Sequence, residues 1–128
     1  MTTEDRLRTH PKDRLAPSVQ RVDLAAASTA LRAEPHAPVA GHRQVALVRR
    51  GPVSIILFVF EKDGYLKEHN ADGEVTIHVL SGNIEVTAGG ETTVLGGGEL
   101  ISLAPSESHS LAAKAPSEML LSICRARA

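Results

Sequence analysis

The pattern of hydrophobic and polar positions changes near residue 41 of this 128-residue chain. From there on, short runs rich in aliphatic and β-branched residues alternate with turn-forming pairs such as Gly51-Pro52 and Gly89-Gly90, the second of which is typical of a two-residue hairpin. Because short strands with close turns and no intervening helices pair in antiparallel order, we expect an all-β sandwich or small barrel. The predicted strands are residues 44–49, 53–61, 66–69, 74–81, 83–88, 91–95, 99–104, 108–113 and 118–124.

Alternation within single runs assigns side chains to opposite faces of the sheet. In residues 74–81, Val75 and Val79 share an apolar face, and His78 lies on the other face. The run 53–60 is apolar on both faces. A strand of that kind needs cover on both sides, so we expect a partner subunit or an N-terminal helix to pack on its second face.

The beginning of the chain has a different character. Residues 1–22 mix charged side chains with prolines and show no hydrophobic period, so we expect an extended or mobile arm. Asp23 is a candidate N-cap for one short amphipathic helix over residues 23–33. We therefore divide the chain into an arm with a short helix, residues 1–40, and a barrel, residues 41–126.

Composition limits the partners of such a protein. Aromatic residues make up 2% of the chain, which leaves few stacking platforms for single-stranded nucleic acid. The first twenty residues contain no apolar segment typical of a secretion signal, and the longest apolar run, residues 55–60, is too short to cross a membrane. The single cysteine, Cys124, forms no intramolecular disulfide. We expect a cytoplasmic protein that binds neither nucleic acid nor a membrane.

Charge is divided unevenly along the chain. Residues 1–51 carry nine Lys and Arg against five Asp and Glu, a net charge of +4, whereas residues 52–128 carry five against ten, a net charge of −5. A basic arm thus precedes an acidic body. We expect the arm to be solvated or to lie on its own barrel or a partner subunit, and recruitment of an acidic partner is the alternative.

Two spaced stretches resemble a known family. Residues 63–82 align with the pattern G-x5-H-x-H-x3,4-E-x6-G, with His69 at the first histidine, and residues 98–113 align with the pattern G-x5-P-x-G-x2-H-x3-N, with His109 at the histidine. Ala104 and Ser106 replace the proline and the second glycine of the second pattern. Together they resemble the two motifs of the cupins. The resemblance covers residues 41–124 and implies a jelly roll, the double-stranded β-helix barrel of that family. Cupins of this size are commonly homodimers, so the resemblance also implies a homodimer.

The resemblance further implies a candidate metal site. In metal-dependent cupins, two histidines and a carboxylate of the first motif and the histidine of the second hold one divalent ion inside the barrel. This chain retains His69 and His109 and has Ala71 and Val75 at the other two positions. Two imidazoles bind iron, manganese, zinc or nickel ions weakly, because a protein site usually supplies at least three ligands. The two histidines are therefore a metal site, the polar groups of a metal-free binding site, or hydrogen-bonded core residues left from a metal-binding ancestor.

Other polar residues are weaker candidates for the same site. Glu74 neighbours the carboxylate position, but alternation points it away from the face of Val75, and a β-bulge would be needed to turn it inward. We interpret His78 either as a ligand-binding residue or as a buried, hydrogen-bonded structural histidine outside the barrel interior. We interpret Glu107 as a solvated loop carboxylate, with a general base near the cavity mouth as the alternative. His42 is expected on the surface, with a position at the barrel mouth or against a neighbouring subunit as the alternative.

Three functions remain open. The first is a non-catalytic or regulatory protein that binds a small molecule in an aliphatic barrel cavity through His69 and His109, with His78 as a further candidate. The second is a metal-dependent enzyme, such as a dioxygenase, isomerase or decarboxylase, that uses the same two histidines on a small organic acid or polyketide-like compound. The third is an interaction module with a basic arm. Because Ala71 and Val75 replace two metal ligands, we favour the first function, and the sequence does not decide whether the chain is an enzyme.

Overall fold

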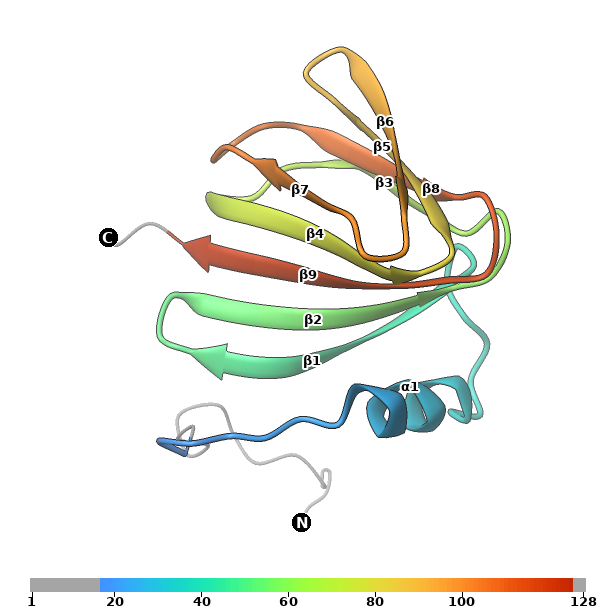
Figure 1. Cartoon of the computed structure of the whole chain (residues 1–128), viewed down its shortest axis with the longest axis vertical. Coiled ribbons are helices and arrows are strands. Elements are labelled where there is room, and N and C mark those ends of the chain that lie inside the picture. Colours follow the sequence, from blue (N-terminus) through green and yellow to red (C-terminus); the bar gives the residue numbers. More distant parts are fainter. Residues whose placement is uncertain (1–16, 126–128) are drawn as a thin grey trace.

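Two antiparallel β-sheets make up most of the computed structural model, which describes residues 17–125 (Figure 1). The elements are α1 (Leu24–Arg32), β1 (His42–Arg50), β2 (Val53–Phe60), β3 (Tyr65–His69), β4 (Gly73–Ser81), β5 (Asn83–Ala88), β6 (Glu91–Gly96), β7 (Leu100–Leu103), β8 (His109–Ala113) and β9 (Ser117–Arg125). Each of the nine predicted strands corresponds to one of these strands, and the predicted helix is α1.

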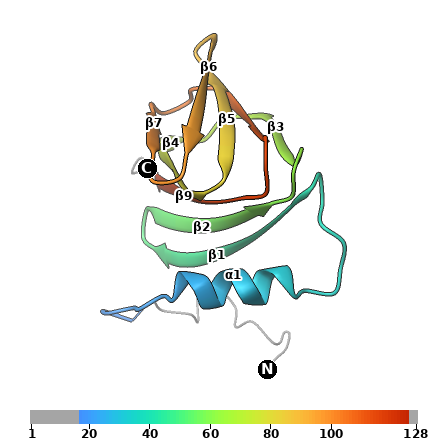
Figure 2. The same cartoon turned by 45° about the vertical axis from the view of Figure 1, so that its right-hand side comes forward.

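The order of the strands identifies the architecture. The five-stranded sheet has the order β1-β2-β9-β4-β7, and the four-stranded sheet has the order β3-β8-β5-β6. After β2 the chain crosses repeatedly between the two sheets, which face each other around a shared interior (Figure 2). This arrangement is a jelly roll. The prediction of an all-β jelly roll with a short N-terminal helix is confirmed.

Strand β2 separates two hydrophobic clusters. Phe58 and Phe60 point into the interior between the sheets and belong to the larger cluster. Leu57 and Val59 point to the opposite face, where they pack with Leu31 of α1 in the second cluster. The expectation that this strand is covered on both faces is confirmed, and α1 supplies the second cover.

Helix α1 is held to the barrel by polar contacts as well. The carboxylate of Asp23 accepts a hydrogen bond from the backbone N–H of Ala26 (3.0 Å), which confirms the predicted N-cap. Buried Ser28 and the guanidinium of Arg32 each donate to Oε2 of Glu118 on β9, both at 2.6 Å. Burial alone would raise the pKa of Glu118, but these two partners outweigh it, so the pKa lies below its usual range. The helix is therefore docked by a charged hydrogen-bond network.

The residues before α1 lie along strand β1. Gln20 donates to the backbone carbonyl of Leu47 (2.8 Å), and Arg50 donates to that of Ser18 (3.2 Å). The rest of the predicted arm, residues 1–16, lies outside the described residues, so the hypothesis that it recruits an acidic partner stays a prediction. Within the described residues, no helix is long and apolar enough to cross a membrane.

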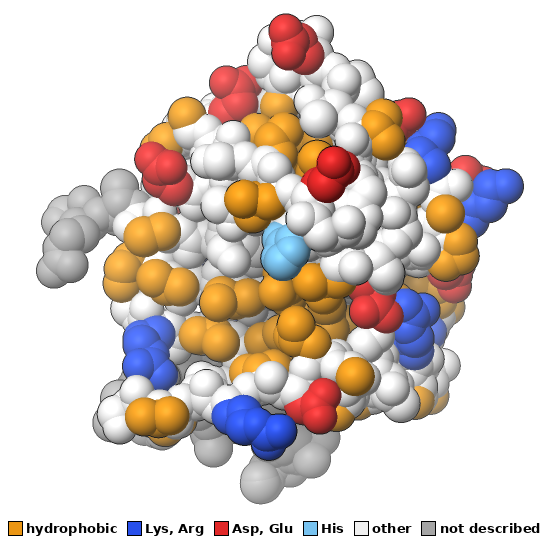
Figure 3. All heavy atoms as spheres, viewed as in Figure 1, with side chains coloured by type: hydrophobic (Ala, Val, Ile, Leu, Met, Phe, Trp, Pro, Cys, Tyr) orange, Lys and Arg blue, Asp and Glu red, His pale blue; other side chains and the backbone are white. Residues whose placement is uncertain are grey.

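Part of the outer face of the five-stranded sheet is not covered by α1. Leu100 on β7 is 60% exposed and pairs with His78 on β4, which in turn pairs with Leu120 on β9. Hydrophobic side chains gather over this face around a histidine (Figure 3). The expected homodimer stays a prediction.

Candidate functional site

Strands β3 and β8 bring two histidines together. His69 ends β3, His109 begins β8, and the two residues are direct partners in the antiparallel register. Their imidazole rings meet edge to face with centroids 4.2 Å apart. His109 is 2% exposed, whereas His69 is exposed. One imidazole therefore lies inside the barrel and the other lies at its mouth.

Backbone carbonyls orient both rings in the same way. Nδ1 of His69 lies 2.8 Å from the carbonyl oxygen of Lys67, and Nδ1 of His109 lies 3.0 Å from that of Glu107. Because a carbonyl oxygen only accepts hydrogen bonds, Nδ1 carries the hydrogen in each ring, and in the neutral form the lone pair is on Nε2. Neither Nε2 has a hydrogen-bond partner among the described residues.

Burial favours the neutral form of the inner imidazole. Burial lowers the pKa of His109, and the neighbouring His69 lowers it further; together they outweigh the hydrogen bond to the Glu107 carbonyl and the charge of the Glu107 carboxylate, which raise it. The net shift favours the neutral form of the imidazole. In this form, the inner end of the pair offers an acceptor nitrogen without charge.

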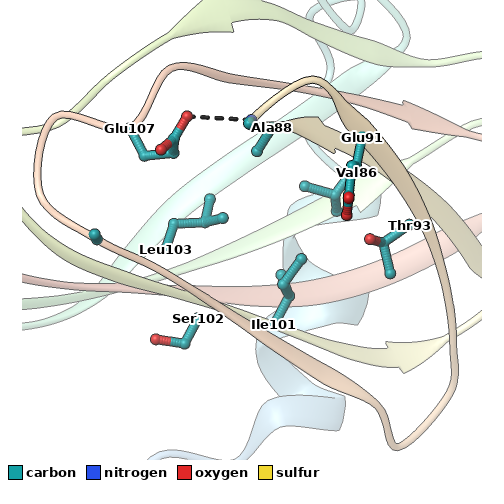
Figure 4. A pocket seen from close by; sticks show the side chains of 10 residues that line it. Val86, Ala88, Glu91, Thr93, Ile101, Ser102, Leu103 and Glu107 are labelled. Carbon is teal, nitrogen blue, oxygen red and sulfur yellow. Dashed lines mark hydrogen bonds between the residues drawn. The ribbon is translucent and has the colours of Figure 1, made fainter.

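A cleft of about 220 Å³ lies between the β5–β6 hairpin and β7 (Figure 4). Val86 and Ala88 of β5 and Ile101 and Leu103 of β7 form its aliphatic wall. Ala88 is also the direct partner of His109 in the pairing of β5 with β8. His109 therefore neighbours the cleft wall through Ala88, although neither His109 nor His69 lines the cleft.

The rim of the cleft is acidic. Glu91 and Thr93 of β6 lie on one side of it, and Glu107, from the loop before β8, lies on the other (Figure 4). Oε2 of Glu107 accepts a hydrogen bond from the backbone N–H of Gly89 (3.1 Å), which ties this loop to the β5–β6 turn. Among the described lining residues there is no lysine or arginine.

Comparison with known proteins identifies the family. The family model of the cupin domain matches residues 56–124. The chain belongs to the cupin family. The resemblance read from the two motifs is thereby confirmed, and no curated protein matches the chain.

Solved structures similar to this cupin share its fold. A conserved protein of unknown function from Streptococcus pyogenes is 27% identical, with a TM-score of 0.65 over 70% of this chain and 78% of that chain. A cupin superfamily protein from Desulfitobacterium hafniense is 21% identical, with a TM-score of 0.70 over 88% of this chain and 99% of that chain. Salicylate 1,2-dioxygenase from Pseudoaminobacter salicylatoxidans is 17% identical, with a TM-score of 0.71 over 80% of this chain and 32% of that larger chain. At the last two identities the likeness extends to the fold alone.

The remaining ligand positions of the cupin motif are apolar in this chain. Val75 is 2% exposed in the core, and Ala71 packs against the same core. Glu74 is exposed, and the pairing of β4 with β9 is regular at this point, so no bulge turns its carboxylate inward. Residues 17–125 contain no group of three or more His, Cys, Asp or Glu side chains that could hold a metal ion. Two imidazoles alone do not fit a resident metal ion, which needs about three protein ligands.

Two other histidines of this cupin lie away from the pair. His78 is half-buried on the outer face of the five-stranded sheet, so the structure does not bring it to the cleft. His42, expected in a solvated position, is half-buried, and its ring centroid lies 5.7 Å from that of Phe58 and 5.5 Å from that of Phe60. The difference arises because His42 pairs with Phe60 on the inward face of β1, so it is part of the barrel wall.

Sequence reasoning missed the acidic rim. Glu107 was expected to be a solvated loop carboxylate, with a place near the cavity mouth only as the alternative, and Glu91 had no assigned role. A signal for Glu91 was present, because the two-residue turn at Gly89-Gly90 fixes the register and places Glu91 opposite Ala88 on the inward face. Glu107 had no such local signal, since its position depends on a hydrogen bond to a turn that lies 18 residues away in the sequence.

Proposed function

We propose that this cupin binds a small molecule at the barrel mouth, in a non-catalytic or regulatory role. The observation that carries the proposal is the cleft itself, whose aliphatic wall includes Ala88, the strand partner of His109. Ligand sites commonly combine apolar walls with a few polar groups. Its volume of about 220 Å³ is below the roughly 300–1,000 Å³ of sites for drug-sized molecules, so the ligand is small.

Filling the cleft tests this proposal. We expect a set of four- to six-carbon alcohols, amines and acids to contain compounds that shift the backbone amide NMR signals of Gly89 and Leu103. The variant Ala88→Phe is expected to abolish these shifts, because its ring occupies the cleft next to His109. The control Thr87→Phe places the same ring on the exposed face of β5 and is expected to keep them.

Two results would contradict small-molecule binding in the cleft. One is that no compound shifts the amide signals of the wild-type protein. The other is that Ala88→Phe, shown by circular dichroism to be folded, responds to the same compounds as the wild type.

A second candidate function is a metal-dependent enzyme, such as a dioxygenase, isomerase or decarboxylase. The observation in its favour is the adjacency of His69 and His109, whose Nε2 atoms have the right chemistry for metal ligands. The donor set counts against it, because Val75 and Ala71 contribute no ligand atom. We therefore place the metal-free function first.

Elemental analysis distinguishes the two candidates. After incubation with Fe²⁺, Mn²⁺, Zn²⁺ or Ni²⁺ and removal of free ions, we expect the tag-free protein to retain far less than one ion per chain, because two imidazoles bind weakly. The double variant His69→Ala, His109→Ala provides the background value. Near-stoichiometric metal in the wild type that disappears in the double variant would overturn the metal-free proposal and support the enzyme.

A further inference from the structure

We propose that the ligand of the cleft is a small aliphatic amine, bound as its ammonium ion. The proposal rests on the proposed function, because it names the chemical class of the molecule that the same cleft takes. Three features carry it: the charge of the rim, the hydrogen-bonding character of the polar groups, and the aliphatic wall.

The rim presents negative charge from two directions. Glu91 lies on β6 on one side of the cleft, and Glu107 lies in the loop on the other side (Figure 4). The backbone N–H of Gly89 donates a hydrogen bond to Oε2 of Glu107, and Oε1 has no hydrogen-bond partner among the described residues. The described lining contains no lysine or arginine to neutralise this charge. An ammonium group between the two side chains is attracted to both carboxylates.

The polar side chains of the lining can all accept a hydrogen bond: the carboxylates of Glu91 and Glu107 and the hydroxyls of Thr93 and Ser102. His109 does not line the cleft, but it is the strand partner of Ala88 in the cleft wall. An alkylammonium has three N–H donors and no acceptor, so it complements a set of acceptors. A carboxylate ligand would instead meet like charge at the rim, at Glu91 and Glu107.

The wall accounts for the aliphatic part of the ligand. Val86, Ile101 and Leu103 present hydrocarbon surface to the cleft, and an alkyl chain packed there is removed from water. The site is therefore matched to a molecule with a short hydrocarbon body and one cationic end.

Three probes with the same four-carbon chain test the proposal. Butylammonium, 1-butanol and butyrate are titrated at pH 7 and low salt, and the NMR shifts of the Gly89 and Leu103 amides report binding. We expect butylammonium to bind about fivefold more tightly than 1-butanol, because two exposed ion pairs together contribute that order of preference. Butyrate is expected to bind most weakly, and added salt is expected to reduce the preference for the ammonium.

Variants that remove a negative charge test whether the two rim carboxylates cause the preference for butylammonium over 1-butanol. Glu91→Gln and Glu107→Gln are each expected to weaken butylammonium binding about twofold, and the double variant is expected to remove its advantage over 1-butanol. The glutamine carbonyl at position 107 still accepts from Gly89, so the loop is retained. Glu85→Gln makes the same charge change on the opposite face of β5, beside Lys114, and is expected to leave the preference unchanged.

Each outcome separates this inference from the proposed function. Butyrate or 1-butanol binding as tightly as butylammonium overturns the amine assignment and leaves the small-molecule site standing. A preference that persists in the folded double variant also overturns it. If none of the three probes moves the amide signals, both the amine assignment and the proposed function fail.

Discussion

Replacing Phe60 by alanine is expected to lower the free energy of unfolding by about 3–5 kcal/mol. The Phe60 side chain is 1% exposed, and its ring stacks with that of Phe58 at a centroid distance of 6.0 Å. The ring of His42 packs against it from the neighbouring strand at 5.5 Å. The chain has two phenylalanines and one tyrosine, and the tyrosine is 43% exposed, so little other aromatic volume is present to fill the cavity.

The loss would be a large part of the total stability. Domains of this size are stable by about 5–15 kcal/mol, so the variant approaches the unfolding threshold. Urea denaturation followed by far-ultraviolet circular dichroism measures the change. Val94→Ala on β6 is the control, because Val94 is 53% exposed and its truncation is expected to cost less than about 0.5 kcal/mol. A loss below about 1 kcal/mol for Phe60→Ala would show that the barrel interior is not packed around this ring.

The strands were predictable because their signals are local. Alternation in residues 74–81 places Val75 and Val79 on one face and His78 on the other, and the structure has the same assignment. The Gly89-Gly90 turn was predictable for the same reason, since both residues have positive φ, 60° and 78°. Period-two alternation and a two-residue turn together fix both the face and the register of a hairpin.

The site was predictable only in part, because its parts come from distant segments. His69 and His109 were recognised through the family motifs, since periodicity alone cannot pair two residues 40 positions apart. The cleft depends on how β7 of one sheet lies against the β5–β6 hairpin of the other. Its shape follows from side-chain packing between sheets, which has no counterpart in the pattern of a single strand.

Replacing Gly41 by alanine is expected to destabilise the protein more than replacing Gly51, although both glycines have left-handed backbones, with φ of +71° and +57°. A Cβ at Gly51 would meet nothing within 4 Å, so this variant measures the backbone cost alone, about 1 kcal/mol. A Cβ at Gly41 would lie 2.6 Å from Cα of Gly64. Because the obstructing atom belongs to the backbone of Gly64, the main chain at Gly41 or Gly64 must shift. We expect a further loss of about 1–3 kcal/mol in the free energy of unfolding.

The contact between these two glycines also positions the histidine site. The Gly41 carbonyl accepts from the N–H of Glu61, and the Ala40 carbonyl accepts from that of Tyr65, both at 2.9 Å, so this contact sets the start of β3. His69 lies at the other end of the same strand. Urea denaturation of the two alanine variants measures the stability difference, and the imidazole NMR signals of His69 are expected to move in Gly41→Ala and to stay in place in Gly51→Ala. Equal losses of stability with unchanged His69 signals would contradict a role for the glycine contact, because the two variants share the backbone cost and differ in the space available to the added methyl group.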